Sequence, residues 1–273
     1  MDKSRNGKDE FSKLRLPGAQ FFDINEVADT SSDLPHMFPG ASLQRAAAAH
    51  FGLQVGRQVV VYEAGPLFAA PRAWWTLKHM GYDARILNGG MQAWISAGES
   101  VVSTPVIPGA LKVQQEFALS GDPSSPPDGV LDFERVQKLS ALLDGEQKQC
   151  NSDNGGTLYI LDARAAGRFN GTSPEPREGI QSGHMPGSTN VPFASLLEAS
   201  DGTLLPMESL QTAFRRAGVS LHNDATYITT CGSGVTAAVI LLALHECGVP
   251  WKSLNLYDGS WLDWATRGGK IIR

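Results

Sequence analysis

Cys231 is the residue whose setting in this 273-residue chain most favours chemistry. It lies in YITTCGSGVTAAVILL, between a β-branched run that predicts a strand and an apolar run that predicts a helix. Because Gly232 and Gly234 have no Cβ, the N–H groups of CGSGV can curl around one point, and the helix N-terminus behind them favours negative charge. The sequence therefore predicts an accessible, nucleophilic thiolate, in a loop that would also stabilise a persulfide anion.

The other two cysteines favour structural roles. Cys247 falls at the end of the apolar helix, and Cys150 lies in a polar stretch without a nearby base. A free cysteine is usually a small buried hydrophobe, but a core cysteine needs no cradle of N–H groups such as the one at Cys231. Three cysteines also exclude a disulfide framework and suit a reducing compartment.

The elements around Cys231 occur twice in the chain. Three pairs of matching landmarks are separated by 169, 168 and 170 positions: Pro17 and Pro186, Glu63 and Cys231, and Trp94 and Trp264. A nearly constant offset indicates a duplicated domain. Each copy alternates short β-branched runs with helical patterns, which predicts an α/β fold with a parallel sheet flanked by helices.

The predicted domains are 1–100 and 130–273, joined by a Pro/Gly/Ser-rich linker over 101–129. A helix opens the second domain, with Asp132 as its expected N-cap. The strand predicted by TLYILDAR, from Thr157, has a counterpart that would precede the first residue. The first domain is therefore expected to be incomplete, with at least one strand missing from its sheet.

The composition narrows the classes of partner. The formal charge is -5, so the surface does not favour nucleic acid or anionic membranes. The longest apolar run, GVTAAVILLAL, is much shorter than the ~20 residues of a membrane-spanning helix. The first ten residues mix both charge signs, so neither a signal nor a transit peptide is expected. We expect no metal or cofactor, because no HExxH, CxxC or Gly-rich nucleotide motif occurs.

CGSGVTA, with GHMPG upstream and YDGSW downstream, resembles the rhodanese superfamily of sulfurtransferases, and within it the branch that uses 3-mercaptopyruvate. The resemblance covers nearly the whole chain except the linker, and implies two tandem rhodanese-like domains of which the second is catalytic. It implies an enzyme that moves sulfane sulfur from a small-molecule donor to Cys231. An acceptor thiol, such as thioredoxin or dihydrolipoate, or cyanide then takes the sulfur, in the cytoplasm or the mitochondrion.

The resemblance also implies roles for residues near Cys231. Arg168 and Arg177 match the family's carboxylate-binding pair, and two guanidinium groups could hold an α-keto acid. Ser233 matches a loop serine that polarises the donor or protonates the leaving enolate. The remaining loop residues are expected to bind substrate: Gly232, Gly234, Val235 and Thr236.

Residues outside the loop extend the implied site. His36 matches a histidine that reaches the site from the first domain, but its acidic partner falls on Asn25, which cannot act as a carboxylate. A Ser-His-Asp relay is therefore not expected. Glu63 occupies the cysteine position of the first copy, so that domain should be non-catalytic. Asp258 and Thr236 are expected to shape the loop.

Three other functions are alternatives for a chain with this fold. Phosphatases of this fold need an arginine six residues after the cysteine, where this chain has Ala237. Thiosulfate-specific relatives carry basic residues directly after the cysteine, whereas Gly232 and Ser233 are neutral. A thiosulfate:cyanide sulfurtransferase and an inactive rhodanese-like binding protein stay open as alternatives.

Overall fold

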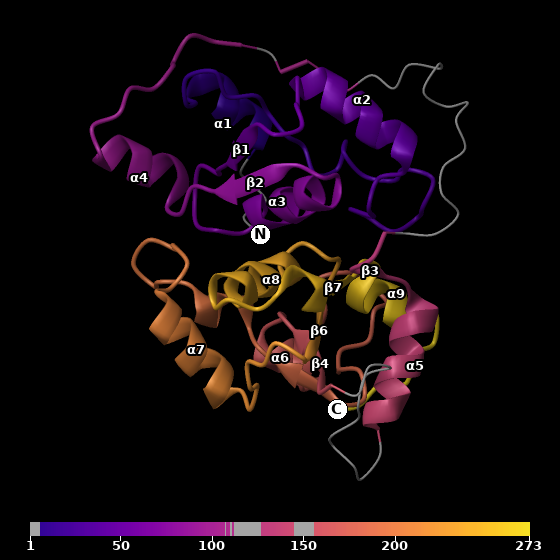
Figure 1. Cartoon of the computed structure of the whole chain (residues 1–273). Helices are drawn as coiled ribbons and strands as arrows, with labels where there is room; N and C mark the ends of the chain where they lie inside the picture. The colour runs from indigo at the N-terminus through magenta and orange to yellow at the C-terminus, as the bar shows by residue number, and fades with distance from the viewer. Residues whose placement is uncertain (1–5, 107, 110, 112–126, 145–155) are drawn as a thin grey trace.

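The computed structural model of the chain describes residues 6–106, 108–109, 111, 127–144 and 156–273. Two parallel sheets, each with helices beside it, form two domains that lie one above the other (Figure 1). The described elements of the first domain are α1 (Gly7–Lys13), α2 (Ala41–Phe51), β1 (Gln58–Val61), α3 (Ala70–His79), β2 (Asp83–Ile86) and α4 (Gly90–Ser96). Those of the second domain are β3 (Val130–Leu131), α5 (Phe133–Leu143), β4 (Leu158–Asp162), α6 (Ala166–Phe169), β5 (Ser188–Asn190), η2 (Phe193–Leu196), α7 (Met207–Arg216), β6 (Thr226–Thr230), α8 (Ala237–Glu246), η3 (Trp251–Ser253), β7 (Leu254–Tyr257) and α9 (Ser260–Thr266).

The sheet of the second domain is parallel throughout, in the order β3-β7-β6-β4-β5. Successive residues of β6 face opposite sides of the sheet, as the pleat requires, so Tyr227 and Ile228 enter different cores. Helices α8 and α7 cover the face of Tyr227, and α5 and α9 cover the face of Ile228. The strand over 226–230 therefore has the short apolar sequence of a strand buried on both faces.

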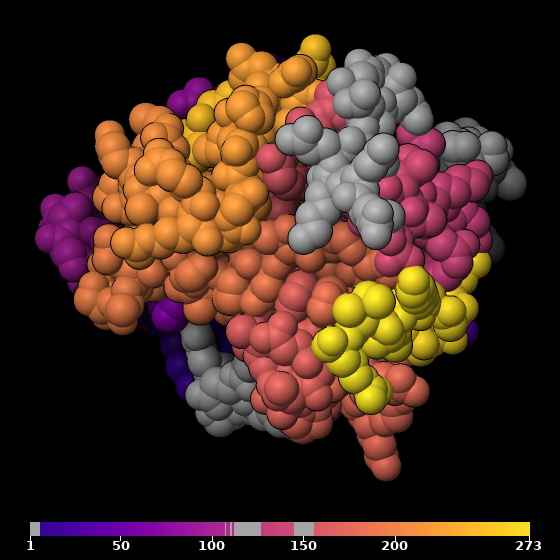
Figure 2. Space-filling view, turned by 90° about the horizontal axis from the view of Figure 1, so that it is seen from below, coloured from indigo at the N-terminus to yellow at the C-terminus, as the bar shows by residue number. Residues whose placement is uncertain are grey.

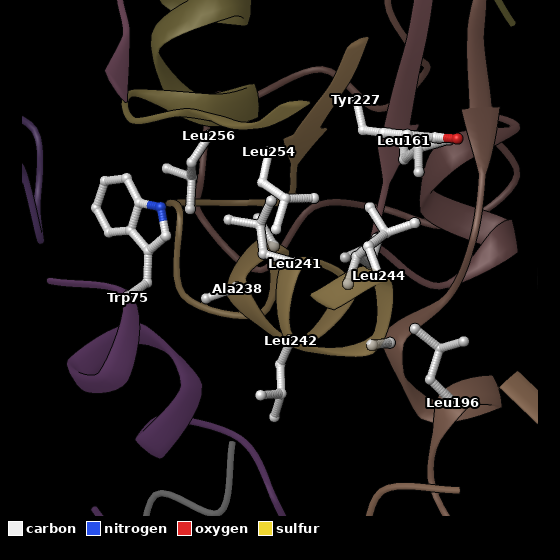
Figure 3. Packing of buried hydrophobic residues seen from close by; sticks show 14 of the residues in the cluster. Trp75, Leu161, Leu196, Tyr227, Ala238, Leu241, Leu242, Leu244, Leu254 and Leu256 are labelled. Atoms are coloured by element: carbon white, nitrogen blue, oxygen red, sulfur yellow. The ribbon is translucent and has the colours of Figure 1, made fainter. Parts of the chain in front are cut away.

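Helix α8 is buried along its length, from Ala237 to Leu244, as its apolar sequence predicts. One side of α8 packs on the sheet, and its other side packs on α3 of the first domain. Trp75 of α3 is fully buried and lies beside Ala238 of α8 and Leu256 of β7 (Figure 3). The two domains therefore share one continuous hydrophobic core.

The view from below shows how completely the second domain forms one side of the molecule. Its segments cover most of that face, and the first domain is visible mainly at the margins (Figure 2). This arrangement agrees with the stacking of the domains through α3 and α8.

The duplicated Pro-Gly turns have the same geometry in both copies. Gly18 and Gly187 have left-handed φ angles of 72° and 71°, which glycine adopts without strain. In both turns, the N–H group after the glycine donates to the carbonyl three residues earlier, at 3.1 Å. Strand β5 follows the second turn because β4 pairs with it. The corresponding residues 19–21 form no strand, since no described residue of the first domain provides a counterpart of β4.

Because no described residue provides a counterpart of β4, one edge of β1 has no neighbouring strand in the described structure. Within the described residues, β1 pairs with β2 alone, whereas its counterpart β6 lies between β7 and β4. Val60 of β1 is 55% exposed, but Ile228, at the matching position of β6, is fully buried. The expected incompleteness of the first sheet thus uncovers apolar surface at an edge strand, which is a site for pairing with other chains.

Two further expectations concern the N-cap of α5 and the linker between the domains. Asp132 is the N-cap of α5, and its carboxylate accepts a hydrogen bond from the N–H group of Arg135 at 2.8 Å, as predicted. Most of the predicted linker and the turn predicted at NSDNGG lie outside the described residues, so the boundaries 1–100, 101–129 and 130–273 stay a prediction. In the described part of the chain, no helix has both the length and the apolar character to cross a bilayer.

We expect faster amide exchange in β1 than in β6. Alternate N–H groups of β1 face its open edge and so lack a ladder partner, whereas those of β6 face neighbouring strands on both sides. Amide hydrogen exchange measured by mass spectrometry should show lower protection over Val59–Val61 than over Tyr227–Thr229. Equal protection of the two segments would mean that another part of the chain covers the β1 edge.

Candidate active site

Three carbonyl groups in the loop after β6 are held by donors from outside the loop. The N–H groups of Trp261 and Leu262 on α9 and the Nη1 atom of Arg72 on α3 donate, at 2.9, 3.1 and 3.1 Å, to the carbonyls of Cys231, Gly232 and Gly234, respectively. In a planar trans peptide, the carbonyl of one residue and the N–H group of the next point in opposite directions. The N–H groups of Gly232, Ser233 and Val235 are therefore turned away from those donors.

Within the described structure, these turned N–H groups have no protein acceptor, and the same is true of every N–H group from Gly232 to Thr236. Free backbone donors at the start of a helix form a site for an anion. Gly234 has a φ of 77°, and a Cβ there would lie 2.8 Å from Arg72 Nη1 and 2.9 Å from the carbonyl oxygen of Asp258. The curl of the loop thus requires glycine at this position.

Cys231 itself is 2% exposed, so the prediction of an accessible thiol is wrong for this structure. The cause is the packing around the loop. Ser260, at the start of α9, accepts a hydrogen bond from the Cys231 N–H group at 3.2 Å. Arg168 also packs against the loop, because its Nη2 atom would lie 3.0 Å from a Cβ built on Gly232. The next two loop residues, Gly232 and Ser233, are half-buried.

Ser260 was missed by the sequence analysis. Its φ is 53°, a left-handed value that is rare outside glycine, and Gly90 has a φ of 50° at the matching position of the first copy. The Ser260 hydroxyl donates to the carbonyl of Tyr257 at 2.9 Å while it accepts from Cys231. The serine of YDGSW, at a position that is glycine in LNGGM of the first copy, was the available signal.

The matching loop of the first domain already holds an anion. The carboxylate of Glu63 accepts hydrogen bonds from the N–H groups of Phe68, Ala69 and Ala70, at 2.6, 3.1 and 3.3 Å. The Met91 N–H group holds the Glu63 carbonyl at 3.1 Å, as Trp261 holds the carbonyl of Cys231. In the first copy, the N–H groups at the start of the helix after the loop are thus occupied by a side chain of the loop itself, which fits the predicted lack of chemistry there.

Arg168, on α6, lies beside the cysteine loop and is held by a carboxylate that the sequence analysis missed. Its Nε atom donates to Glu175 at 3.0 Å, and Nη2 contacts the same oxygen. Glu175 also pairs with the buried Arg164 at 2.8 Å, and Arg164 pairs with Asp162 at 2.6 Å. In the described structure Arg168 Nη1 donates to no protein acceptor, so one edge of the guanidinium remains for a ligand carboxylate.

Arg177 of the second domain lies close enough to His36 of the first for its charge to act on the imidazole. Arg177 is exposed and forms no ion pair with any described residue. Burial and the positive charges of Arg72 and Arg177 lower the pKa of His36 to about 4, against the opposing charges of Asp258 and Asp23. His36 is therefore neutral at pH 7, and it has a left-handed φ of 65°.

Asp23 is the acidic residue near His36 from its own domain that sequence reasoning missed. The expected position, Asn25, is exposed, and its side-chain amide donates to Asp23 at 2.8 Å. The negative charge of Asp23 acts to raise the pKa of His36. Ser233 forms no side-chain hydrogen bond with the described residues.

The remaining candidates lie close to the loop. Thr236 is buried and directly precedes α8. The carboxylate of Asp258 accepts from Arg72 Nη2 at 2.7 Å and from the Phe38 N–H group at 2.5 Å, so it ties the first domain to the second. Burial raises the pKa of Cys247 to about 11, which keeps that thiol protonated at pH 7, and Cys150 lies outside the described residues.

Comparison with known proteins places this geometry in a family. A family model described as a rhodanese-like domain matches residues 5–97 and 136–267. The chain belongs to the rhodanese family. Its matches over nearly the whole chain to curated sulfurtransferases make it a sulfurtransferase, which takes sulfur from a donor and passes it to an acceptor.

Two relatives and one solved structure illustrate the match. A 3-mercaptopyruvate sulfurtransferase of Escherichia coli (strain K12) is 37% identical over 97% of this chain and 85% of that protein. The mitochondrial thiosulfate/3-mercaptopyruvate sulfurtransferase 1 of Arabidopsis thaliana is 34% identical over 97% of this chain and 69% of its own length. The crystal structure of SseA from Escherichia coli superposes with a TM-score of 0.71 at 34% identity, over 95% of this chain and 88% of that one.

Because its pKa is lowered, His36 should make the folded protein less stable in acid, and substitution of His36 should remove that effect. The unfolded imidazole binds a proton near its ordinary pKa of 6.5, but the folded one does so only near 4. His36 thus contributes stability above pH 6.5 that is lost as the pH falls from 6.5 to 4. His36→Asn, which tolerates a positive φ, should flatten this part of the pH dependence. Urea unfolding of both proteins at several pH values tests this, and identical slopes would contradict it.

Proposed function

We propose that this sulfurtransferase takes sulfur from 3-mercaptopyruvate and stores it as a persulfide on Cys231. The observation that supports this most is the loop of free N–H groups after Cys231, with the guanidinium of Arg168 beside it. The loop suits an anionic sulfur, and the guanidinium suits a single carboxylate. The names of relatives such as the Escherichia coli protein support the choice of donor.

In the first half-reaction, the Cys231 thiolate attacks the sulfur of the donor. A sulfur–sulfur bond forms, and the carbon–sulfur bond breaks with its electron pair moving to the carbon that becomes the pyruvate enolate. The free N–H groups of Gly232, Ser233 and Val235 stabilise the negative charge on the sulfur atoms. Arg168 and Arg177 hold the carboxylate. The Ser233 hydroxyl passes the thiol proton of the donor to the enolate carbon, which gives pyruvate and leaves the persulfide on Cys231 as the anion.

In the second half-reaction, an acceptor thiolate or cyanide attacks the outer sulfur of the persulfide and forms a bond to it. The sulfur–sulfur bond breaks, and its electron pair returns to the Cys231 sulfur. Thioredoxin, dihydrolipoate and cyanide are the acceptors that we propose to test, and the cytoplasm or the mitochondrion is the compartment that we propose. His36 stays neutral at pH 7, so it adds no positive charge beside the loop.

Thiosulfate is the second candidate donor. One relative's name, thiosulfate/3-mercaptopyruvate sulfurtransferase 1, includes it. The neutral Gly232 and Ser233 provide no cation for a dianion directly after the cysteine. We therefore propose thiosulfate as the poorer donor.

Cys231→Ser should abolish sulfur transfer and leave the fold intact. A hydroxyl is far less acidic than a thiol and cannot store sulfane sulfur. Incubation with 3-mercaptopyruvate should add the mass of one sulfur to the tryptic peptide that contains Cys231 in the wild type. Cys247→Ser is the matched control and should still load, because its thiol stays protonated at pH 7. Loading of the Cys231→Ser protein would reject the proposal.

Arg168→Ala and Arg177→Ala should each lower kcat/KM for 3-mercaptopyruvate more than for thiosulfate. The loss of a charge-assisted hydrogen bond costs ~1.5–3 kcal/mol, or roughly ten- to a hundredfold in kcat/KM. Arg216→Ala, an exposed arginine on α7, is the control and should leave both donors unaffected. If both donors lose activity equally, the two arginines support the loop and do not recognise the carboxylate.

A further inference from the structure

Arg72 is a buried arginine from the first domain that reaches the cysteine loop of the second. It lies on α3 and is 2% exposed. Its Nη1 donates to the carbonyl of Gly234 at 3.1 Å, and its Nη2 donates to Asp258 at 2.7 Å and to the carbonyl of His36. Its guanidinium also stacks on the ring of Trp75, 4.7 Å from the centroid.

These contacts fix the guanidinium from several directions. The Asp258 carboxylate, itself held by the Phe38 N–H group, balances the charge of Arg72 in the interface. The stacking on Trp75 sets the plane of the guanidinium. Its Nη1 atom is thereby aimed at the carbonyl oxygen of Gly234.

The hydrogen bond to Gly234 determines the direction of one loop donor. Because the peptide between Gly234 and Val235 is planar, holding the carbonyl toward Arg72 turns the Val235 N–H group the opposite way. The start of α9 controls the N–H groups of Gly232 and Ser233 in the same manner. One of the three oriented donors thus depends on the first domain.

We propose that Arg72 is a positioning residue for sulfur transfer, through which the non-catalytic domain aligns the Val235 N–H group with the sulfur carried on Cys231. This inference rests on the proposed function. It gives the first domain a part in the reaction although its own loop is filled by Glu63. Arg72 acts through the backbone and need not touch the donor.

The test compares Arg72→Met with Asn88→Ala. Asn88 also joins the domains, since its side chain exchanges hydrogen bonds with the backbone of Leu204 at 3.2 and 2.8 Å, but it has no contact with the cysteine loop among the described residues. It is therefore a control for general loosening of the interface. Single-turnover loading of Cys231 with 3-mercaptopyruvate gives the maximal rate and the half-saturating concentration separately for each variant.

Arg72→Met should slow the maximal loading rate about 10- to 100-fold, below the effect of deleting an oxyanion-hole donor outright, with little change in half-saturation. Asn88→Ala should load at close to the wild-type rate even if its unfolding midpoint falls. A wild-type rate in Arg72→Met overturns the proposal. So does an equal slowing in both variants at equal loss of stability.

Two additions keep the test decisive. If Arg72→Met does not fold, because Asp258 is then a buried unpaired charge, the double variant Arg72→Met/Asp258→Asn removes that charge and should show the same slow loading. Alkylation of Cys231 by iodoacetamide, followed on its tryptic peptide, needs no sulfur donor. Slower alkylation in the Arg72 variant supports the proposal even if the wild type takes no sulfur from 3-mercaptopyruvate, whereas unchanged alkylation overturns it.

Discussion

The site depends on keeping the N–H groups of the loop after Cys231 without an acceptor among the described residues. Leaving a buried donor unsatisfied costs roughly 1–3 kcal/mol, so a protein keeps several of them together only where the surrounding structure enforces it. Here the enforcement comes from outside the loop, because α9 and Arg72 bind three of its carbonyl groups. An anionic sulfur on Cys231 would satisfy the exposed donors, and the loop thus favours the species that the reaction must store.

The two copies of the domain show two solutions to the same constraint. In the first copy the Glu63 carboxylate satisfies the N–H groups at the start of α3 permanently. In the second copy Cys231 is at the matching position, and the N–H groups from Gly232 to Thr236 have no acceptor among the described residues. Both loops join a strand to a helix, but Glu63 replaces the cysteine and Pro66 replaces Gly234, so one loop is a structural cap and the other is a site for a reactive sulfur.

Much of this organisation follows from sequence pattern. The duplication, the strand and helix around Cys231, the cap at Asp132 and the complete burial of α8 could all be predicted, because they depend on local periodicity and on short motifs. Arg72 could not. Its partners Asp258 and Gly234 are 186 and 162 residues away, and nothing local tells a buried arginine from a solvated one.

The burial of Cys231 was mispredicted for a related reason. A strand followed by a glycine loop predicts a curl of N–H groups, but it does not predict what packs over that curl. The start of α9 and the guanidinium of Arg168 lie there, and Glu175 holds that guanidinium in place. Charged residues at the end of β4, such as Asp162 and Arg164, were a signal of a buried ion network that periodicity alone does not interpret.

The core shared by α3 and α8 has a consequence for how the protein folds. A unit that is a domain by sequence repeat is usually assumed to fold by itself, but Trp74 and Trp75 complete a core that belongs mainly to the second domain. Without them, the outer side of α8 would face water with alanine, leucine and valine side chains. The stability of the second copy therefore depends on contacts with the first, and the two halves of the duplication are joined by one buried core.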